Sequence, residues 1–327
     1  MTTSETDEVL TTVTPTTSSS SDETRFCFQY AVVFIGIMGA VANGLILYAM
    51  VASKQHKKQF LIFNQNVFDL CSCLLLSLTY SLQICNVRLT GMFGYWLCML
   101  VLSENLICCS ISGSRVNLMS IATERYLKVV CRTRSKRVLR KWVIYSVAAF
   151  AWIISVVYNQ AVVFSTSGVV DGVCYGFVMW KNRLAAVAYG IWAFISFFVV
   201  VICIFLFCYG RILMVIRRQA RVMAEHSGPG PSIAQTDSLH HIQTSVIKTM
   251  IFVSAFFVIT GIPNEVYYMM LNVKPGFTLH NVVNYIGLFS AFLYITANPF
   301  IYATKFDQVR RVLVDLIPFK KKVTTSS

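Results

Sequence analysis

Charged residues are scarce in this sequence. Asp, Glu, Lys and Arg make up 13% of its 327 residues, whereas hydrophobic residues make up 56%. Soluble domains carry about 25% charged residues, and the mean hydropathy here is +0.63. A chain with so little polar surface cannot cover a water-facing globule, so we expect an integral membrane protein.

Acidic residues are especially few, because 14 Asp and Glu stand against 28 Lys and Arg, for a formal net charge of +14. A basic balance of this size is also found in nucleic-acid-binding proteins. Here the basic residues lie in short gaps between apolar runs, as they do in the cytoplasmic loops of membrane proteins. We therefore expect the lipid bilayer as a partner and no nucleic acid.

The sequence also lacks the patterns of an enzyme or a metal site. It has no phosphate-binding loop, no nucleophile paired with a base and no pair of Cys-x-x-Cys motifs. Most of the 11 cysteines lie inside apolar stretches, where free cysteine behaves as a small buried hydrophobe. We expect no catalytic activity, no metal and no cofactor.

Residues 1–26 contain few apolar residues and no basic segment followed by an apolar one, so we expect no cleaved signal peptide. They are rich in Thr and Ser and carry several acidic residues. Such a composition cannot bury a core, and we expect a disordered extracellular tail. The remaining chain divides into a membrane domain, residues 27–304, and a cytoplasmic amphipathic helix with a tail, residues 305–327.

Seven apolar stretches in the membrane domain are long enough to cross a bilayer, which takes about 20 residues in a helix. With the amphipathic segment from Lys305 to Ile317, they predict an all-α fold, a seven-helix transmembrane bundle with a short eighth helix. The polar stretch from Arg218 to Gln243, which contains Gly228-Pro229-Gly230-Pro231, predicts a flexible connector. The seven stretches cover approximately residues 28–52, 60–84, 96–128, 142–166, 184–216, 245–272 and 279–302.

The basic residues also predict the orientation of the bundle. Lys and Arg are concentrated after the first, third and fifth stretches and in the C-terminal tail. The positive-inside rule then places the N-terminus outside the plasma membrane and the C-terminus inside. Cys98 and Cys174 fall on the outer, oxidising side, where we expect a disulfide that pins the loop over the mouth of the bundle. A second bridge between Cys27 and Cys85 is an alternative.

Short motifs at fixed places on these stretches resemble those of the rhodopsin-like (class A) G-protein-coupled receptors. They cover most of the chain, and the set, in order and each on its expected helix, is specific. The motif residues are Asn43, Asp69, Glu124-Arg125-Tyr126, Trp152, Tyr209, Pro263 and Asn298-Pro299-Phe300-Ile301-Tyr302.

The resemblance implies a role for each motif. Arg125, flanked by Glu124 and Tyr126, would contact the α-subunit of a heterotrimeric G protein when the sixth span swings outward. The hydroxyls of Tyr209 and Tyr302 would hold that open form. Prolines remove helix hydrogen bonds, so Pro263 and the Asn298-Pro299 pair would let two spans bend. A buried Asp69 needs partners, and the resemblance offers Ser114, Asn43 and Asn298.

The sequence departs from the family pattern in the middle of the membrane. Gly261 stands where a tryptophan is usual, the fifth span has no proline, and Tyr294 replaces an asparagine that helps to bind sodium. The gap from Cys98 to Arg125 is two residues longer than usual. Sodium regulation at Asp69 is therefore in question. Arg115, where the family has an aliphatic residue, is expected either to pair with Asp69 in place of sodium or to reach water.

Two carboxylates in the outer half of the bundle suggest the charge of the ligand. Glu104 lies eleven residues before Arg115 and on the same side of a helix, and Glu265 lies just beyond Pro263. Two carboxylates favour a cationic ligand group such as an amine or a peptide. We also expect ligand contacts from Ile107, which stands at the height of the amine-anchoring aspartate of aminergic receptors, and from Tyr268 and Asn284.

We therefore expect a receptor that binds an extracellular ligand and activates a heterotrimeric G protein. The alternatives are a seven-helix transporter or channel and a ligand-independent, constitutively active receptor. Only four hydroxyl residues in the tail could be phosphorylated, so we expect limited engagement of arrestin. They are Thr324, Thr325, Ser326 and Ser327.

Overall fold

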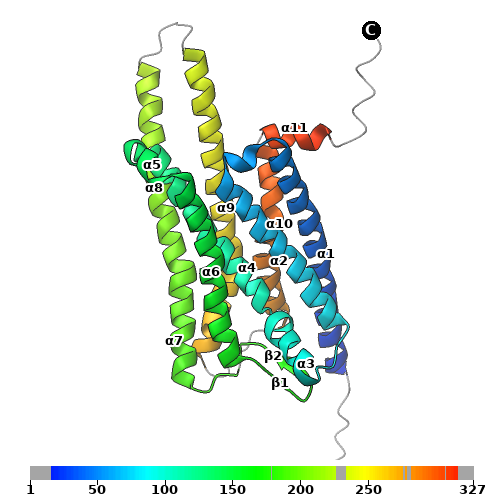
Figure 1. Ribbon diagram of the computed structural model, residues 1–327. Coiled ribbons are helices and arrows are strands. Elements are labelled where there is room, and N and C mark those ends of the chain that lie inside the picture. Colours follow the sequence, from blue (N-terminus) through cyan, green and yellow to red (C-terminus); the bar gives the residue numbers. More distant parts are fainter. Residues whose placement is uncertain are drawn as a thin grey trace, which may run out of the picture.

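Long helices form a bundle in the computed structural model, which describes residues 16–177, 179–225, 233–274, 277, 281–305 and 307–315 (Figure 1). Two short strands form a hairpin at one end. The elements in chain order are α1 (Thr16–Ala52), η1 (Gln55–Lys57), α2 (Phe60–Ile84), α3 (Gly91–Leu97), η2 (Cys98–Leu102), α4 (Asn105–Val129), α5 (Arg132–Val138), α6 (Lys141–Thr166), β1 (Gly168–Val170), β2 (Val173–Tyr175), α7 (Arg183–Phe194), η3 (Ile195–Val199), α8 (Val200–Glu225), α9 (Ile233–Val273), α10 (Asn281–Lys305) and α11 (Asp307–Asp315).

The helices form seven spans, as predicted. Within the described residues, six segments are long and apolar enough to cross a membrane by length and composition. The seventh span, α10, contains Asn284, Asn298 and Pro299, which lower its hydropathy, and it packs against α1 and α9. α4 lies in the centre of the bundle, against α2, α6 and α8.

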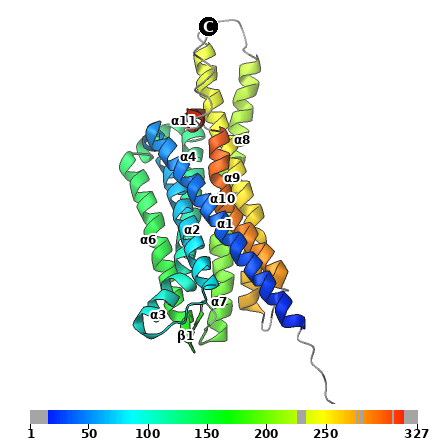
Figure 2. The same cartoon turned by 90° about the vertical axis from the view of Figure 1, so that its right-hand side faces the viewer.

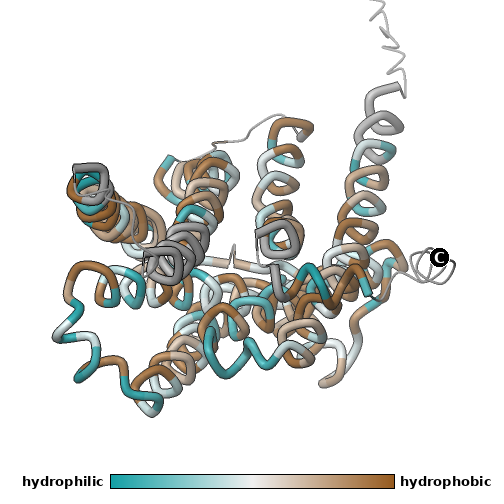
Figure 3. The backbone as a smooth tube through the Cα atoms, turned by 90° about the horizontal axis from the view of Figure 1, so that it is seen from above, coloured by the Kyte–Doolittle hydropathy of each residue, from teal (hydrophilic) through white to brown (hydrophobic). Residues whose placement is uncertain are grey.

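Large apolar side chains cover the outside of the bundle. Phe34 on α1, Ile153 on α6 and Leu206 on α8 are each more than 60% exposed. Water would oppose such exposure, whereas lipid tails accommodate it. A view along the bundle shows helix walls that are largely hydrophobic and hydrophilic stretches in the connections (Figure 3). The outer surface is therefore the lipid-facing one.

The two ends of the bundle differ. The hairpin end carries β1, β2 and α3. The basic end carries α5, α11, the C-terminal end of α8 and the N-terminal end of α9, and these ends of α8 and α9 extend beyond the other helices (Figures 1 and 2). Arg132, Arg134, Lys136 and Arg137 all lie on α5. α11 crosses the basic end and buries Val309, as the predicted amphipathic helix should.

The third span is not the continuous helix that the sequence predicted. α3 leads into the π-helical turn η2, in which the amide of Ser103 donates to the carbonyl of Cys98 at 3.0 Å. Glu104 then adopts a left-handed conformation with φ 62° before α4 begins. A π turn holds one residue more than an α turn. The turn and the left-handed residue thus take up the two extra residues between Cys98 and Arg125.

The fifth span has a similar irregularity in place of a proline. α7 and α8 are joined by the π-helical turn η3. Such a turn leaves backbone groups poorly paired and bends a helix locally, as a proline does. The sequence gives no simple sign of it, because the residues of η3 are apolar apart from Ser196 and include neither glycine nor proline.

Two predicted boundaries are wrong. α1 begins at Thr16 rather than near residue 28, so the part of the tail from 16 to 26 is helical; extending an existing helix is far easier than starting one. The connector predicted from Arg218 to Gln243 is shorter for the same reason, because α8 continues to Glu225 and α9 starts at Ile233. Residues 1–15, the Gly-Pro repeat at 228–231 and residues 316–327 lie outside the described residues.

The hairpin lies across one end of the bundle and is held there by the predicted disulfide. Val169 pairs with Cys174 in the antiparallel ladder. Asp171 and Gly172 both have positive φ, as the two central residues of a type I′ turn require. Cys174 is bonded to Cys98, with the two Cα atoms 5.4 Å apart. The alternative second bridge does not form, because Cys27 and Cys85 are both free and exposed.

We predict that Cys98→Ser lowers the stability of the protein by about 2–4 kcal/mol, since the disulfide closes a long loop in the unfolded chain. The change is measured as a fall in the thermal unfolding midpoint in detergent. Cys85→Ser, which removes a free and exposed thiol, is the matched control. Equal midpoints for both variants would contradict the role assigned to the bridge.

Candidate functional site

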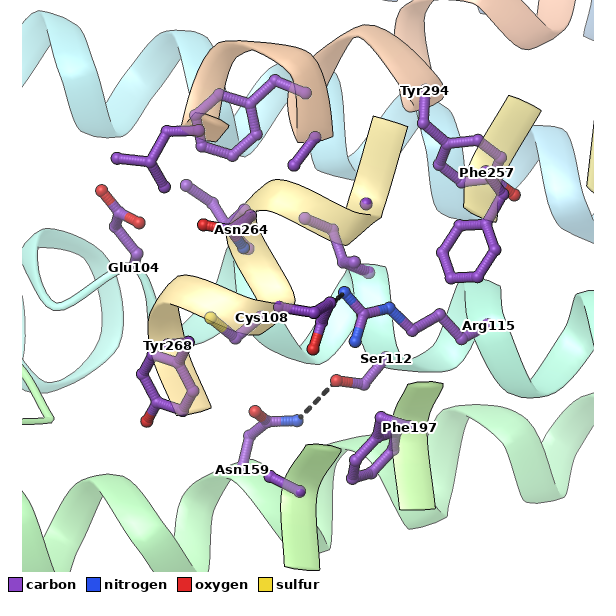
Figure 4. Close-up of a pocket in the computed structure, with 18 of the residues that line it drawn as sticks. Glu104, Cys108, Ser112, Arg115, Asn159, Phe197, Phe257, Asn264, Tyr268 and Tyr294 are labelled. Atoms are coloured by element: carbon purple, nitrogen blue, oxygen red, sulfur yellow. Dashed lines mark hydrogen bonds and ion pairs between the residues drawn. The ribbon is translucent and has the colours of Figure 1, made fainter. Parts of the chain in front are cut away.

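A cavity of about 170 Å³ opens in the hairpin-end half of the bundle; we call it the main cavity (Figure 4). Its walls come from α4, α6, α7, α9 and α10, and Phe177, just after the hairpin, also lines it. The lining residues are Glu104, Ile107, Cys108, Ile111, Ser112, Arg115, Tyr158, Asn159, Phe177, Tyr189, Ala193, Phe197, Phe257, Thr260, Gly261, Asn264, Glu265, Tyr268, Leu288, Ala291, Phe292 and Tyr294.

An ion pair spans the deeper part of the main cavity. Arg115 on α4 contacts the carboxylate of Glu265 on α9, and its guanidinium carbon lies 5.6 Å from the centre of the Phe257 ring. Of the two alternatives expected for Arg115, pairing with Asp69 is therefore wrong. Asp69 already has three hydrogen-bond donors of its own, whereas Glu265 faces the same cavity as Arg115.

Glu104 occupies the hairpin-end part of the cavity. The left-handed backbone there turns its side chain inward, where one carboxylate oxygen accepts a hydrogen bond from Tyr80 at 2.8 Å. Glu104 has no ion pair within the described part of the chain. The helix between Glu104 and Arg115 starts only at Asn105, yet both side chains line the main cavity, as their spacing predicted.

Aromatic side chains form one wall. The rings of Tyr158 and Tyr189 are stacked with centroids 6.2 Å apart, and Tyr268 meets Tyr189 edge to face at 6.4 Å. Of these, only Tyr268 was predicted from the sequence. From the sequence, Tyr158 and Tyr189 could not be distinguished from the many lipid-facing aromatic residues of the same spans. The rotation of each helix about its axis determines whether a side chain faces the cavity or the lipid.

The five residues predicted to bind ligand do not all meet. Glu104, Ile107, Glu265 and Tyr268 line the main cavity. Asn284 lies outside it, in a separate apolar recess between α9 and α10 that includes Pro263. The predicted position of Asn284 in the main cavity is therefore wrong, because the rotation of α10 turns this residue away from the other four.

A second polar group lies deeper, around Asp69. This residue is fully buried. One carboxylate oxygen accepts from Gln65 at 3.3 Å and from Ser114 at 3.2 Å, and the other accepts from Asn298 at 2.7 Å. Asn43, the remaining residue of the predicted network, donates instead to the backbone of Gly39 and Ile295, at 2.9 and 3.2 Å.

The network continues to Trp152 through Gln65, Asn117 and Asn64, which were not predicted from the sequence. Gln65 accepts from Asn117 at 2.9 Å, Asn117 accepts from Asn64 at 2.9 Å, and Asn64 accepts from Trp152 at 3.1 Å. The chain of bonds thus links α2, α4 and α6. A signal for it was present: amides in an apolar span need partners, and Gln65 precedes Asp69 by four residues, one helical turn.

The arrangement at Asp69 does not fit a sodium ion. The amide nitrogen of Gln65 contacts Asp69, Ser114 and the hydroxyl of Tyr294 together, so a neutral donor fills the space between these oxygens. A sodium ion needs several free oxygens, and here the oxygens already accept from side-chain donors. We therefore assign no ion to this site.

The basic end of α4 carries Glu124, Arg125 and Tyr126. Glu124 pairs with Lys128 and lies 3.6 Å from Arg125. Two guanidinium nitrogens of Arg125, Nε and Nη2, are buried with no hydrogen-bond partner among the described residues. A buried donor without an acceptor costs about 1–3 kcal/mol, which marks this arginine as incompletely satisfied.

Nearby, α8 and α9 are joined through a bond between the hydroxyls of Tyr209 and Ser254 at 3.1 Å. Pro263 lies inside α9, and Ser290 on α10 donates to the carbonyl of Thr260, three residues before the proline, at 3.0 Å. Pro299 interrupts α10. The side chain of Tyr302 and the tail hydroxyls at 324–327 lie outside the described residues.

A bundle of seven membrane spans with a disulfide-held hairpin over an internal cavity defines a seven-transmembrane receptor. The chain belongs to the rhodopsin family, because residues 42–302 match the model of the family described as 7 transmembrane receptor (rhodopsin family). Members of this family are signalling receptors that work with G proteins and are not enzymes. A search of curated proteins finds no match to this sequence.

We predict that Gln65→Ala destabilises the protein by about 1–3 kcal/mol, because it removes one of the three donors to Asp69 and the amide oxygen that accepts from Asn117, both in a buried site. The thermal unfolding midpoint in detergent measures this. Gln160→Ala, in which the amide oxygen lost has no partner among the described residues, is the matched control.

We also expect that replacing choline chloride by sodium chloride leaves the thermal unfolding midpoint of the unmodified protein unchanged. A rise in the midpoint would show that sodium binds.

Proposed function

We propose that this receptor binds a small cationic ligand in the main cavity and activates a heterotrimeric G protein at the basic end. In this proposal the hairpin end faces the outside of the plasma membrane and the basic end faces the cytoplasm. The observation that carries it is Arg125 at the basic end of the central helix, where two of its buried nitrogens have no hydrogen-bond partner among the described residues.

The charge of the cavity supports a cationic ligand. Arg115 neutralises Glu265, so Glu104 is left as the one carboxylate among the described cavity residues without a cation. An anionic ligand would meet that charge directly, whereas an ammonium group would be attracted by it. The aromatic wall suits an aromatic or aliphatic body attached to the cation.

The basic end suits a protein partner that supplies acceptors. Arg125 offers several donors in a fixed plane, and a carbonyl or carboxylate on the C-terminal helix of a G-protein α-subunit would satisfy them. The bond between Tyr209 and Ser254 ties α8 to α9 in the present arrangement. Movement of α9 about Pro263 would open the space beside Arg125.

A transporter or channel is the alternative with less support. A polar path through the bundle would need groups that stay open to water. The polar side chains around Asp69 are buried and bonded to one another, and Phe257 and Tyr294 pack with ring centroids 5.0 Å apart beside the deep end of the main cavity. These contacts favour a receptor, in which helices shift, over a conduit.

The proposal predicts that Arg125→Ala abolishes G-protein activation while the protein still folds. Membranes that contain the receptor are mixed with purified heterotrimers of each α-subunit class, and binding of a nonhydrolysable GTP analogue is measured, with and without a panel of aromatic amines and short basic peptides. Arg88→Ala, an equal loss of charge at the hairpin end, is the control and should signal as the unmodified protein does. Signalling by Arg125→Ala would contradict the proposal.

For any amine found active in that panel, Glu104→Gln should weaken its potency about tenfold or more, because the ammonium loses its counter-charge. Asn284→Ala, which lies outside the main cavity, should leave the potency unchanged. The neutral alcohol of the same shape serves as the second comparison and should be indifferent to the Glu104→Gln change. Undiminished potency at Glu104→Gln would remove this residue from the ligand site.

A further inference from the structure

The ion pair between Arg115 and Glu265 links two helices that otherwise touch little. α4 packs mainly against α2, α6 and α8, and α9 packs mainly against α7 and α10. The pair is thus a principal direct tie between the central helix and α9. It also faces the main cavity, and the side chains of Arg115 and Glu265 are 15% and 11% exposed.

Glu265 lies on α9 at a position where its contact with Arg115 can hold one half of the helix in place. Glu265 lies two residues beyond Pro263, where the helix has lost a backbone hydrogen bond. The contact with Arg115 therefore holds the hairpin-end half of α9 against α4. The basic-end half is held separately, through Ser254 and Tyr209 on α8. The proline lies between the two points of attachment.

Packing alone explains the pair poorly. Apolar residues of similar size would hold two helices together without the cost of burying two charges, and such replacements are often neutral or stabilising. Conversely, removing one partner leaves a buried charge alone. An ion pair in this place therefore provides something that apolar packing does not: a contact that a charged molecule in the cavity can compete for.

We propose that the Arg115–Glu265 pair is a latch that holds α9 against α4, and that a charged ligand in the main cavity opens it. This inference rests on the proposed receptor function and names the regulation of the same site. A cationic group that enters beside Glu104 competes with Arg115 for Glu265. Release of Glu265 frees α9 to move about Pro263.

The released guanidinium has another place to go. Phe257 already lies 5.6 Å from it, and a cation over a ring face is a favourable contact. Phe257 in turn packs against Tyr294 on α10, with centroids 5.0 Å apart, and against Phe205 on α8, at 6.3 Å. A shift of Arg115 would therefore change the packing between α8, α9 and α10.

The first experiment uses single and paired substitutions in the full-length receptor. Arg115→Gln and Glu265→Gln should each raise basal binding of the GTP analogue about fivefold or more. The exchanged pair, Arg115→Glu with Glu265→Arg, should return it toward the original level. Lys181→Gln, an exposed cation at the hairpin end, is the control and should change nothing.

A second variant separates a latch from simple packing. Arg115→Met combined with Glu265→Leu keeps apolar bulk between α4 and α9 but removes the charges. A latch predicts high basal activity with a retained thermal unfolding midpoint. A purely structural contact predicts the basal activity of the unmodified receptor, and that result would overturn the proposal, as would an exchanged pair that remains as active as the single variants.

Hydrogen–deuterium exchange of the purified receptor provides a readout that needs no G protein. The single variants should speed backbone exchange in the segment 247–262 of α9, and the exchanged pair should slow it again. If no variant activates any G protein but this exchange pattern is found, the latch holds and the proposed signalling partner fails. If exchange in α9 is the same in all variants, the latch itself is wrong.

Discussion

The structure depends on one constraint: an ionisable or amide side chain inside a membrane bundle must find a partner on another helix. Asp69 meets this need through α4 and α10, and Arg115 meets it through α9. Glu104 is bonded to Tyr80 on α2. Each costly group thus becomes a contact between helices.

The constraint divides the interior into levels. At the hairpin end, the cavity keeps one unneutralised carboxylate, Glu104, open to a ligand. Below it, Arg115 and Glu265 neutralise each other, and side-chain hydrogen bonds link Asp69 to Gln65 and Gln65 to Asn117. At the basic end, Arg125 is again incompletely satisfied. Glu104 and Arg125 thus lie at the two ends where a receptor meets other molecules.

Irregular backbone in the third span also helps to position its functional residues. The π turn at Cys98–Leu102 and the left-handed Glu104 let the third span begin at a disulfide and still place Arg125 at the opposite end. Sequence periodicity predicts the helix on both sides of such a turn, but not the turn, because no residue in it is a strong helix breaker.

The sequence by itself determined the membrane class, the spans, and the disulfide, because hydropathy, loop charge and the side of the membrane are local properties. It also marked Asp69 and Arg115 as residues that need partners, and Glu265 as a residue of the ligand site. The tertiary structure decided which partners they have. Arg115 pairs with Glu265 and not Asp69, and Asn284 faces away from the cavity, because helix rotation and the packing of neighbouring spans, rather than depth along the chain, determine which side chains meet.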